Sequence, residues 1–157
     1  MKNASATIKR IMPKSKLFFD SSALFAGVIS PAGAARALLV LAESRHLEIV
    51  VSEQVIAETE SALARKAPQT LLDYRQALRS TNLTIIRNPL PADVKQHLNL
   101  IVHLPDVSIV LAAMQAQVDF LVTLNRRHFM DDPQVAIRAQ LRIGTPGDAL
   151  KWWREQI

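Results

Sequence analysis

Apolar residues follow two alternating patterns along the chain. Short apolar runs bounded by polar or turn residues predict buried strands, and apolar residues at three- and four-residue spacing predict helices. The predicted strands cover residues 16–20, 47–51, 83–86, 119–123 and part of 139–143. The predicted helices cover residues 34–45, 53–66, 69–80, 92–100, 107–117 and a last segment ending at 152–154. Strands that alternate with helices predict a parallel α/β sheet covered on both faces.

Three local signals refine this pattern. Residues 21–30, followed by Pro31 and Gly33, predict a corner with a turn between a strand and a helix. Ser52 is a good N-cap for the helix that follows it. Residues 107–117 are apolar almost all round, which predicts a helix buried inside the domain.

Composition narrows the class of protein. A chain of 157 residues suits one domain with a real core, and aliphatic side chains must fill most of it because aromatic residues make up only 5%. The chain has no cysteine, which excludes disulfides, thiolate metal sites and cysteine nucleophiles. This fits a reducing cytosol, so we expect a cytoplasmic protein. No apolar run reaches the roughly 18 to 20 residues that span a bilayer, so we expect no membrane association.

The net charge of +5 is concentrated at one end of the chain. Five of the 19 basic residues lie in the first sixteen positions, which carry no acid, and the other 14 equal the 14 acidic residues. We therefore expect a basic extension over residues 1–15 and a folded domain over 16–157. The extension has two interpretations: a solvated, disordered tail, or an anchor for nucleic acid.

Four polar residues stand where ligands bind in open parallel sheets, beyond the carboxyl ends of the strands. Asp20 ends the first strand and Asn125 follows the fourth. Asp106 opens the buried helix, and Glu58 lies in the helix after the second strand. The handedness of parallel connections allows these positions to meet in one cleft.

Each acid also has a structural interpretation. Asp20 and Asp106 are good helix-capping residues. Asp106, however, begins a nearly all-apolar helix, where a carboxylate needs a partner such as a cation. Glu58 and Glu60 flank the apolar stripe of their helix at about equal angles, and Glu53 suits the first turn. Spacing alone leaves the choice among these three open.

Four segments, taken together and in order, resemble the motifs of PIN-domain nucleases. The resemblance covers about residues 16–148 and is strongest to the toxin components (VapC-like ribonucleases) of toxin–antitoxin pairs. The matching segments are Leu17-Phe-Phe-Asp-Ser-Ser-Ala-Leu24, Val50-Val-Ser-Glu-Gln-Val-Ile-Ala-Glu58, Pro105-Asp-Val-Ser-Ile-Val-Leu-Ala-Ala113 and Asp119-Phe-Leu-Val-Thr-Leu-Asn-Arg-Arg-His-Phe129.

The resemblance implies a three-layer α/β/α sandwich with a mainly parallel sheet of about five strands. It implies metal-dependent cleavage of single-stranded RNA with Mg²⁺ or Mn²⁺, and selects Asp20, Glu58 and Asp106 as metal-holding catalytic carboxylates. It also implies a homodimer silenced by a cognate antitoxin protein.

One position departs from the family pattern. Asn125 stands where many PIN domains carry a fourth acid. An amide oxygen can still serve in the outer shell of a metal ion, but it brings no charge. Asp131 and Asp132 either substitute for the missing acid or turn the chain before Pro133. The alternative function is therefore a PIN-like module that binds RNA or protein with little or no turnover.

Residues around these acids have further predicted roles. The hydroxyls of Ser22 and Thr123 are candidates for orienting a water or a phosphate oxygen. Arg126 and Arg127 are candidates for binding RNA phosphates, since a guanidinium can grip phosphate through two hydrogen bonds. His128 is either a proton shuttle or a packed or capping histidine. A phosphatase of the haloacid dehalogenase type is disfavoured, because it needs an acid where Ser22 stands.

Overall fold

A parallel sheet forms the centre of the molecule. The computed structural model describes residues 13–157, so most of the predicted basic extension lies outside the described residues. Within this range the sheet has five strands in the order β3-β2-β1-β4-β5, and every neighbouring pair is parallel. The strands are β1 (Lys16–Phe19), β2 (Glu48–Ser52), β3 (Thr84–Ile86), β4 (Phe120–Val122) and β5 (Arg142–Gly144).

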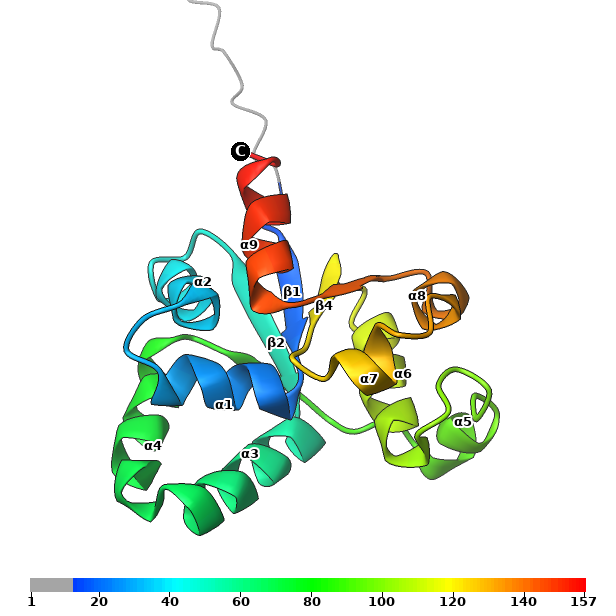
Figure 1. Cartoon of the computed structure of the whole chain (residues 1–157), viewed down its shortest axis with the longest axis horizontal. Coiled ribbons are helices and arrows are strands. Elements are labelled where there is room, and N and C mark those ends of the chain that lie inside the picture. Colours follow the sequence, from blue (N-terminus) through cyan, green and yellow to red (C-terminus); the bar gives the residue numbers. More distant parts are fainter. Residues whose placement is uncertain (1–12) are drawn as a thin grey trace, which may run out of the picture.

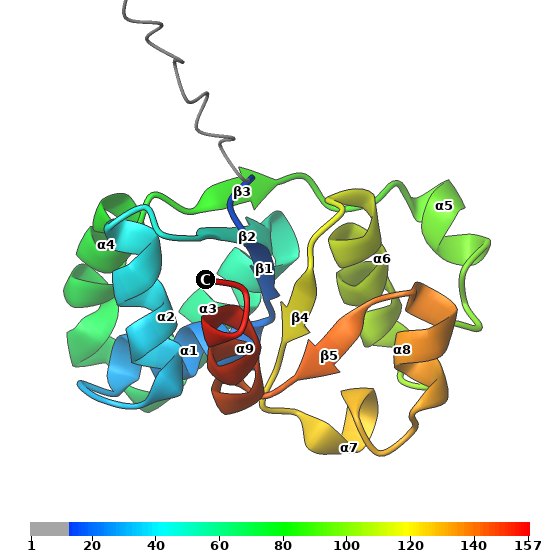
Figure 2. The ribbon, with the colours of Figure 1, turned by 90° about the horizontal axis from the view of Figure 1, so that it is seen from above.

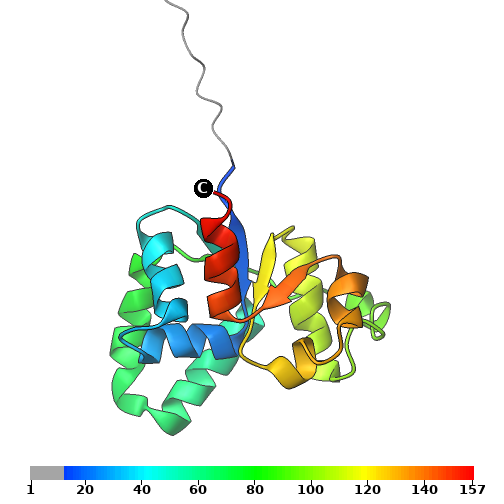
Figure 3. The ribbon, with the colours of Figure 1, turned by 45° about the horizontal axis from the view of Figure 1, so that its top comes forward.

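Helices cover both faces of this sheet, which confirms the predicted three-layer α/β/α sandwich (Figures 1 and 2). The first face carries α1 (Ser21–Ile29), α2 (Ala34–Glu43), α3 (Glu53–Lys66), the 3₁₀ turn η1 (Pro68–Thr70), α4 (Leu71–Ser80) and α9 (Pro146–Arg154). The second carries α5 (Pro91–Lys95), the 3₁₀ turn η2 (Leu104–Asp106), α6 (Val107–Gln115), α7 (Arg126–Phe129) and α8 (Gln134–Ala139). Helix α9 lies against the sheet beside α2 (Figure 3).

The core is built on the central strands and on α6. Leu17, Phe18 and Phe19 of β1 are fully buried, because a central parallel strand is covered on both faces. The predicted burial of the apolar helix is confirmed, since Val107 and the five residues from Ile109 to Ala113 are all buried. The predicted N-cap is also confirmed: the Ser52 hydroxyl accepts a hydrogen bond from the backbone N–H of Val55.

The prediction of a corner over residues 21–30 was wrong, because these residues form the helix α1. Gly27 permits close packing of α1 on α2, since a Cβ at this position would lie 2.7 Å from Cδ1 of Leu39. The break at Pro31 and Gly33 therefore lies between two helices and not between a strand and a helix.

Other differences between the predicted and observed elements lie on the second face of the sheet. The helix predicted over 92–100 ends at Lys95, where the chain tightens into turns and the His97 ring contacts the carbonyl of Asp93. Helices α7 and α8 were not predicted because each is too short to show helical periodicity. Strand β5 lies at Arg142–Gly144, slightly later than predicted, because α8 extends to Ala139.

The connections of the sheet diverge between β1 and β4. The chain leaves β1 towards β2 over the first face, whereas it enters β4 from the second face (Figure 2). This is the switch point at which open α/β sheets bind ligands. Asp20 immediately follows β1 there, and Thr123 immediately follows β4.

Among residues 13–157, no single helix is long and apolar enough to cross a membrane, and only the bent pair α1 and α2, at 87°, meets the length and composition together.

Candidate active site

Asp20 lies at the centre of the switch point and is only 5% exposed. It is the N-cap of α1, and its Oδ1 accepts hydrogen bonds from the Ala23 backbone N–H at 2.9 Å and the Ser22 hydroxyl at 2.6 Å. Its Oδ2 accepts from the hydroxyl of Thr123. Burial raises the pKa of Asp20, these hydrogen bonds oppose the rise, and the nearby charge of Asp106 adds to it. Asp20 therefore combines a capping role with the position of a ligand.

Ser22 and Thr123 connect this carboxylate to the chain after β4. The Ser22 hydroxyl accepts a hydrogen bond from the backbone N–H of Leu124 at 2.9 Å. The Thr123 hydroxyl accepts one from the backbone N–H of Asn125, also at 2.9 Å. Each of the two hydroxyls donates its single proton to the carboxylate of Asp20, and so holds this side chain in place. Their predicted role in orienting a water or a phosphate oxygen stays a prediction.

Glu58 reaches the same edge of the sheet from α3. It is exposed, and its Oε2 accepts a hydrogen bond at 2.9 Å from the hydroxyl of Ser21, the residue after Asp20. Glu53, in contrast, accepts from the Asn88 backbone N–H. Among the described residues, no hydrogen bond or ion pair links Glu60 to the switch point. Of the three acids in this helix, Glu58 is therefore the one that contacts the residue after Asp20.

Gln54 is part of this arrangement and was not predicted. Its side-chain amide donates to Oε1 of Glu58 at 2.8 Å and to the carbonyl of Pro105 at 3.2 Å. Its carbonyl oxygen accepts from the hydroxyl of Ser108. Gln54 thus links Glu58 to the start of α6. Its spacing of four residues from Glu58, which places both on one helix face, was the signal in the sequence.

Asp106 begins α6 on the other side of the switch point, and its side chain is 17% exposed. Although it occupies the N-cap position, it makes no side-chain capping hydrogen bond. Its Oδ2 instead lies 2.8 Å from Nδ1 of His103 and 2.9 Å from Nδ1 of His128. His103 was not predicted; its position three residues before Asp106 was the available signal.

Asn125 makes local contacts. Its Oδ1 accepts a hydrogen bond from the His128 backbone N–H at 3.2 Å and thereby caps α7. Its Nδ2 lies 2.9 Å from Nδ1 of His128. A place in the outer shell of a metal ion stays a prediction for this residue. His128, which had two interpretations, packs its ring beside Asp106.

The cations predicted to bind RNA lie on the surface. Arg126 and Arg127 are both exposed, and among residues 13–157 neither forms a salt bridge. Asp132 pairs with Arg138 at 3.2 Å, and its substitution for the missing fourth acid stays a prediction. The RNA-binding role of Arg126 and Arg127 stays a prediction.

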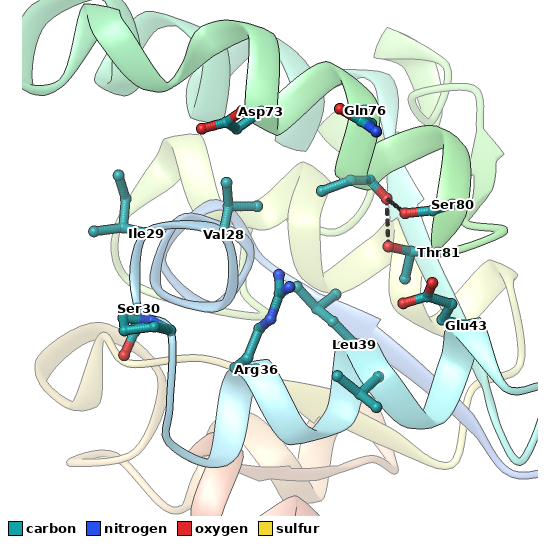
Figure 4. Close-up of a pocket in the computed structure, with 13 residues that line it drawn as sticks. Val28, Ile29, Ser30, Arg36, Leu39, Glu43, Asp73, Gln76, Ser80 and Thr81 are labelled. Carbon is teal, nitrogen blue, oxygen red and sulfur yellow. Dashed lines mark hydrogen bonds between the residues drawn. The ribbon is translucent and has the colours of Figure 1, made fainter.

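A cavity of about 440 Å³ lies elsewhere, between α1, α2 and α4 (Figure 4). Its wall includes Val28, Arg36, Asp73 and Thr81, and none of the site residues described above lines it. The cavity therefore lies between these helices and away from the carboxylates described above.

Comparison with protein families matches residues 16–127 to the PIN domain. The chain belongs to the PIN-domain family. PIN domains are generally nucleases and typically use divalent metal ions. The carboxylates of this PIN domain therefore lie at the edge where open α/β sheets generally bind ligands.

Two solved structures share the fold of this PIN domain. PAE2754 from Pyrobaculum aerophilum has a TM-score of 0.56 and 18% identity, over 90% of this chain and 96% of that chain. VapBC2 from Rickettsia felis, bound to a DNA fragment from its promoter, has a TM-score of 0.60 and 18% identity, over 83% of this chain and 98% of that chain. Comparison with curated proteins finds no match.

Proposed function

We propose that this PIN domain is a metal-dependent endoribonuclease that hydrolyses phosphodiester bonds of single-stranded RNA. The observation that carries the proposal is the buried carboxylate of Asp20, which lies within the field of Asp106. Among residues 13–157, no lysine or arginine forms a salt bridge with Asp20, Glu58 or Asp106. Carboxylates at one edge of the sheet that form no salt bridge with lysine or arginine suit a bound cation.

The donor set fits Mg²⁺ or Mn²⁺. Asp20, Glu58 and Asp106 offer carboxylate oxygens, which these hard cations prefer, and Asn125 is our candidate for the outer shell. When bound, such an ion activates water and neutralises charge that develops on the phosphate.

The chain's own residues hold this donor set in position. Ser22 and Thr123 fix the two oxygens of Asp20 from opposite sides. Ser21 and Gln54 do the same for Glu58. Side chains held in this way keep ligands near a productive geometry before a substrate arrives. The exposed Arg126 and Arg127 would then bind the phosphates of the RNA strand.

We further propose that the protein is a homodimeric toxin silenced by a cognate antitoxin protein. The proposal is supported by the resemblance of its motifs to toxin components and by a fold shared with VapBC2. Induced expression in a bacterial host should stop growth, and Glu58→Gln should restore it. Equal growth arrest by both proteins would contradict the toxin proposal.

The central test is cleavage of single-stranded RNA by the full chain with Mg²⁺ or Mn²⁺, with and without chelator. Glu58→Gln should lower the rate by at least about 100-fold, because it removes one charged ligand. Glu53→Gln and Glu60→Gln are matched controls on the same helix and should retain the wild-type rate. Cleavage that ignores chelator, or that survives Glu58→Gln, would contradict this function.

Asn125 supports a second candidate, a PIN-like module that binds RNA or protein with little or no turnover. Its amide caps α7 and brings no charge to the site. Titration with Mn²⁺ separates the two candidates: tight binding of the metal, with no cleavage of any RNA offered, would favour the binding module.

A further inference from the structure

Three potential metal ligands of different chemistry converge beside the carboxylates. One ring nitrogen each of His103 and His128 and a carboxylate oxygen of Asp106 all lie within 4.8 Å of one another. Both ring nitrogens face the same oxygen, Oδ2, at 2.8 and 2.9 Å. The rings themselves are stacked, with centroids 4.1 Å apart and planes 23° from parallel. Two segments far apart in the sequence, η2 and α7, thus direct imidazole nitrogens to one point.

Nδ1 of His128 lies beside an acceptor and a donor at once. A proton on Nδ1 can be donated to Oδ2 of Asp106 at 2.9 Å, but it leaves the amide Nδ2 of Asn125, another donor at 2.9 Å, without an acceptor there. If Nδ1 carries no proton, its lone pair faces the carboxylate of Asp106. The backbone N–H of His128 donates to Oδ1 of Asn125, which disfavours rotation of the amide. A cation between the ring nitrogen and the carboxylate oxygen would satisfy both acceptors.

The cluster also has access to solvent. A cavity of about 540 Å³ is lined by His103 and His128 together with Pro105, Arg127 and Val135, among others. Two of the three residues, His103 and His128, line this cavity, so an ion held by the three could keep one coordination position open to water or an external ligand.

We propose that His103, Asp106 and His128 form a transition-metal site of the Zn²⁺ class, in addition to the proposed Mg²⁺ or Mn²⁺ site. Imidazole nitrogen suits Zn²⁺, Co²⁺ and Ni²⁺, whereas Mg²⁺ takes oxygen ligands. The two sites share the side chain of Asp106. Its Oδ2 faces the histidines, and among residues 13–157 no hydrogen bond reaches its Oδ1.

Calorimetric titration of the full chain with Zn²⁺, at about pH 7.5 where ordinary imidazoles are mostly neutral, measures this site directly. We expect one Zn²⁺ per chain in the wild type. His103→Ala and His128→Ala should each weaken Zn²⁺ binding by about tenfold or more, since even indirect partners of metal ligands have effects of this size. His97→Ala is the matched control, because its ring contacts a backbone carbonyl away from the cluster, and it should bind like the wild type.

A second measurement does not depend on any variant. Co²⁺ bound to the wild type in this site should show the visible absorption of low-symmetry nitrogen and oxygen coordination, and added Zn²⁺ should abolish it. A wild type that binds neither Zn²⁺ nor Co²⁺ would overturn the proposal. Equal Zn²⁺ affinity in the wild type and both histidine variants would also overturn it.

The outcome is separable from that of the proposed ribonuclease activity. Glu58→Gln should abolish RNA cleavage with Mg²⁺ and leave Zn²⁺ affinity unchanged, because Glu58 is not a ligand of the histidine site. Loss of Zn²⁺ binding in Glu58→Gln would show that the ion occupies the carboxylate site, and would overturn a separate histidine site.

Discussion

Asp20 and Glu58 are neighbours through two consecutive serines, yet their surroundings differ. Ser22 donates to Asp20, and Ser21 donates to Glu58. Asp20 is buried and also accepts a backbone N–H and a buried threonine hydroxyl. Glu58 is exposed, and both its partners are side chains. Asp20 therefore has a structural role beside its proposed role as a metal ligand, whereas Glu58 has few contacts that the fold requires.

Because the two acids differ in burial, substitutions can distinguish effects on stability from effects on activity. A buried acceptor that is removed leaves its donors without partners, which destabilises the native state. An exposed acceptor is replaced by water at little cost. Substitutions at the two positions should therefore have similar effects on RNA cleavage and unequal effects on folding.

The largest expected effect on stability is that of Asp20→Ala. It removes the cap of α1 and leaves the Thr123 hydroxyl and the Ala23 N–H without their acceptor. We expect the free energy of unfolding to fall by about 3 kcal/mol, the sum of a lost cap and unpaired buried donors. Urea denaturation measures this, and Asp20→Asn, which keeps one acceptor oxygen, should lose less. A loss below about 1 kcal/mol for Asp20→Ala would show that burial of Asp20 matters little to the fold.

A smaller effect is expected at Asp148, another acid at this edge of the sheet. Thr145 caps α9, and its backbone N–H donates to Asp148 in a capping box; this hydrogen bond lowers the pKa of Asp148. Asp148→Ala should lower the free energy of unfolding by about 1 kcal/mol at neutral pH.

The effect of Asp148 should depend on pH in a defined direction. Because its pKa is lower in the folded state, its carboxylate stabilises the protein above the unfolded pKa of about 3.9 and loses this effect as the pH falls through the folded value. The gap between wild type and Asp148→Ala, measured by urea denaturation, should narrow in that acidic range. A constant gap would mean that the charge does not contribute.

The smallest effect on stability is expected for Glu58→Ala. Its partners, Ser21 and Gln54, can bond to water when the carboxylate is lost, so the free energy of unfolding should change by no more than about 0.5 kcal/mol. The same urea titration tests this, beside an RNA cleavage assay in which activity should be lost. A loss of stability as large as that of Asp20→Ala would remove the distinction between the two acids.

The strand ends could be predicted from the sequence because they depend on short-range patterns. The apolar run before Asp20 and the all-apolar segment after Asp106 define buried elements, and a parallel sheet brings their ends to one edge. Short-range patterns did not predict the helix α1, whose Gly27 packs closely on Leu39 of α2. That contact lies between two helices and leaves no periodic signal.

The choice of Glu58 could not be made from periodicity. Glu58 and Glu60 flank one apolar stripe, and only the Ser21 hydroxyl and the Gln54 amide distinguish them in space. His103 was missed for the same reason. Its spacing from Asp106 allows a contact, but its relation to His128 depends on where α7 packs.

The capping role of Asp20 has a consequence for descent within such a family. If the proposed activity were lost in a descendant, the position of Asp20 would still be constrained, because its oxygens cap α1 and accept from Thr123. Glu58 is exposed and is under less constraint from folding. Retention of the first acid is therefore a weaker sign of the proposed nuclease activity than retention of the glutamate.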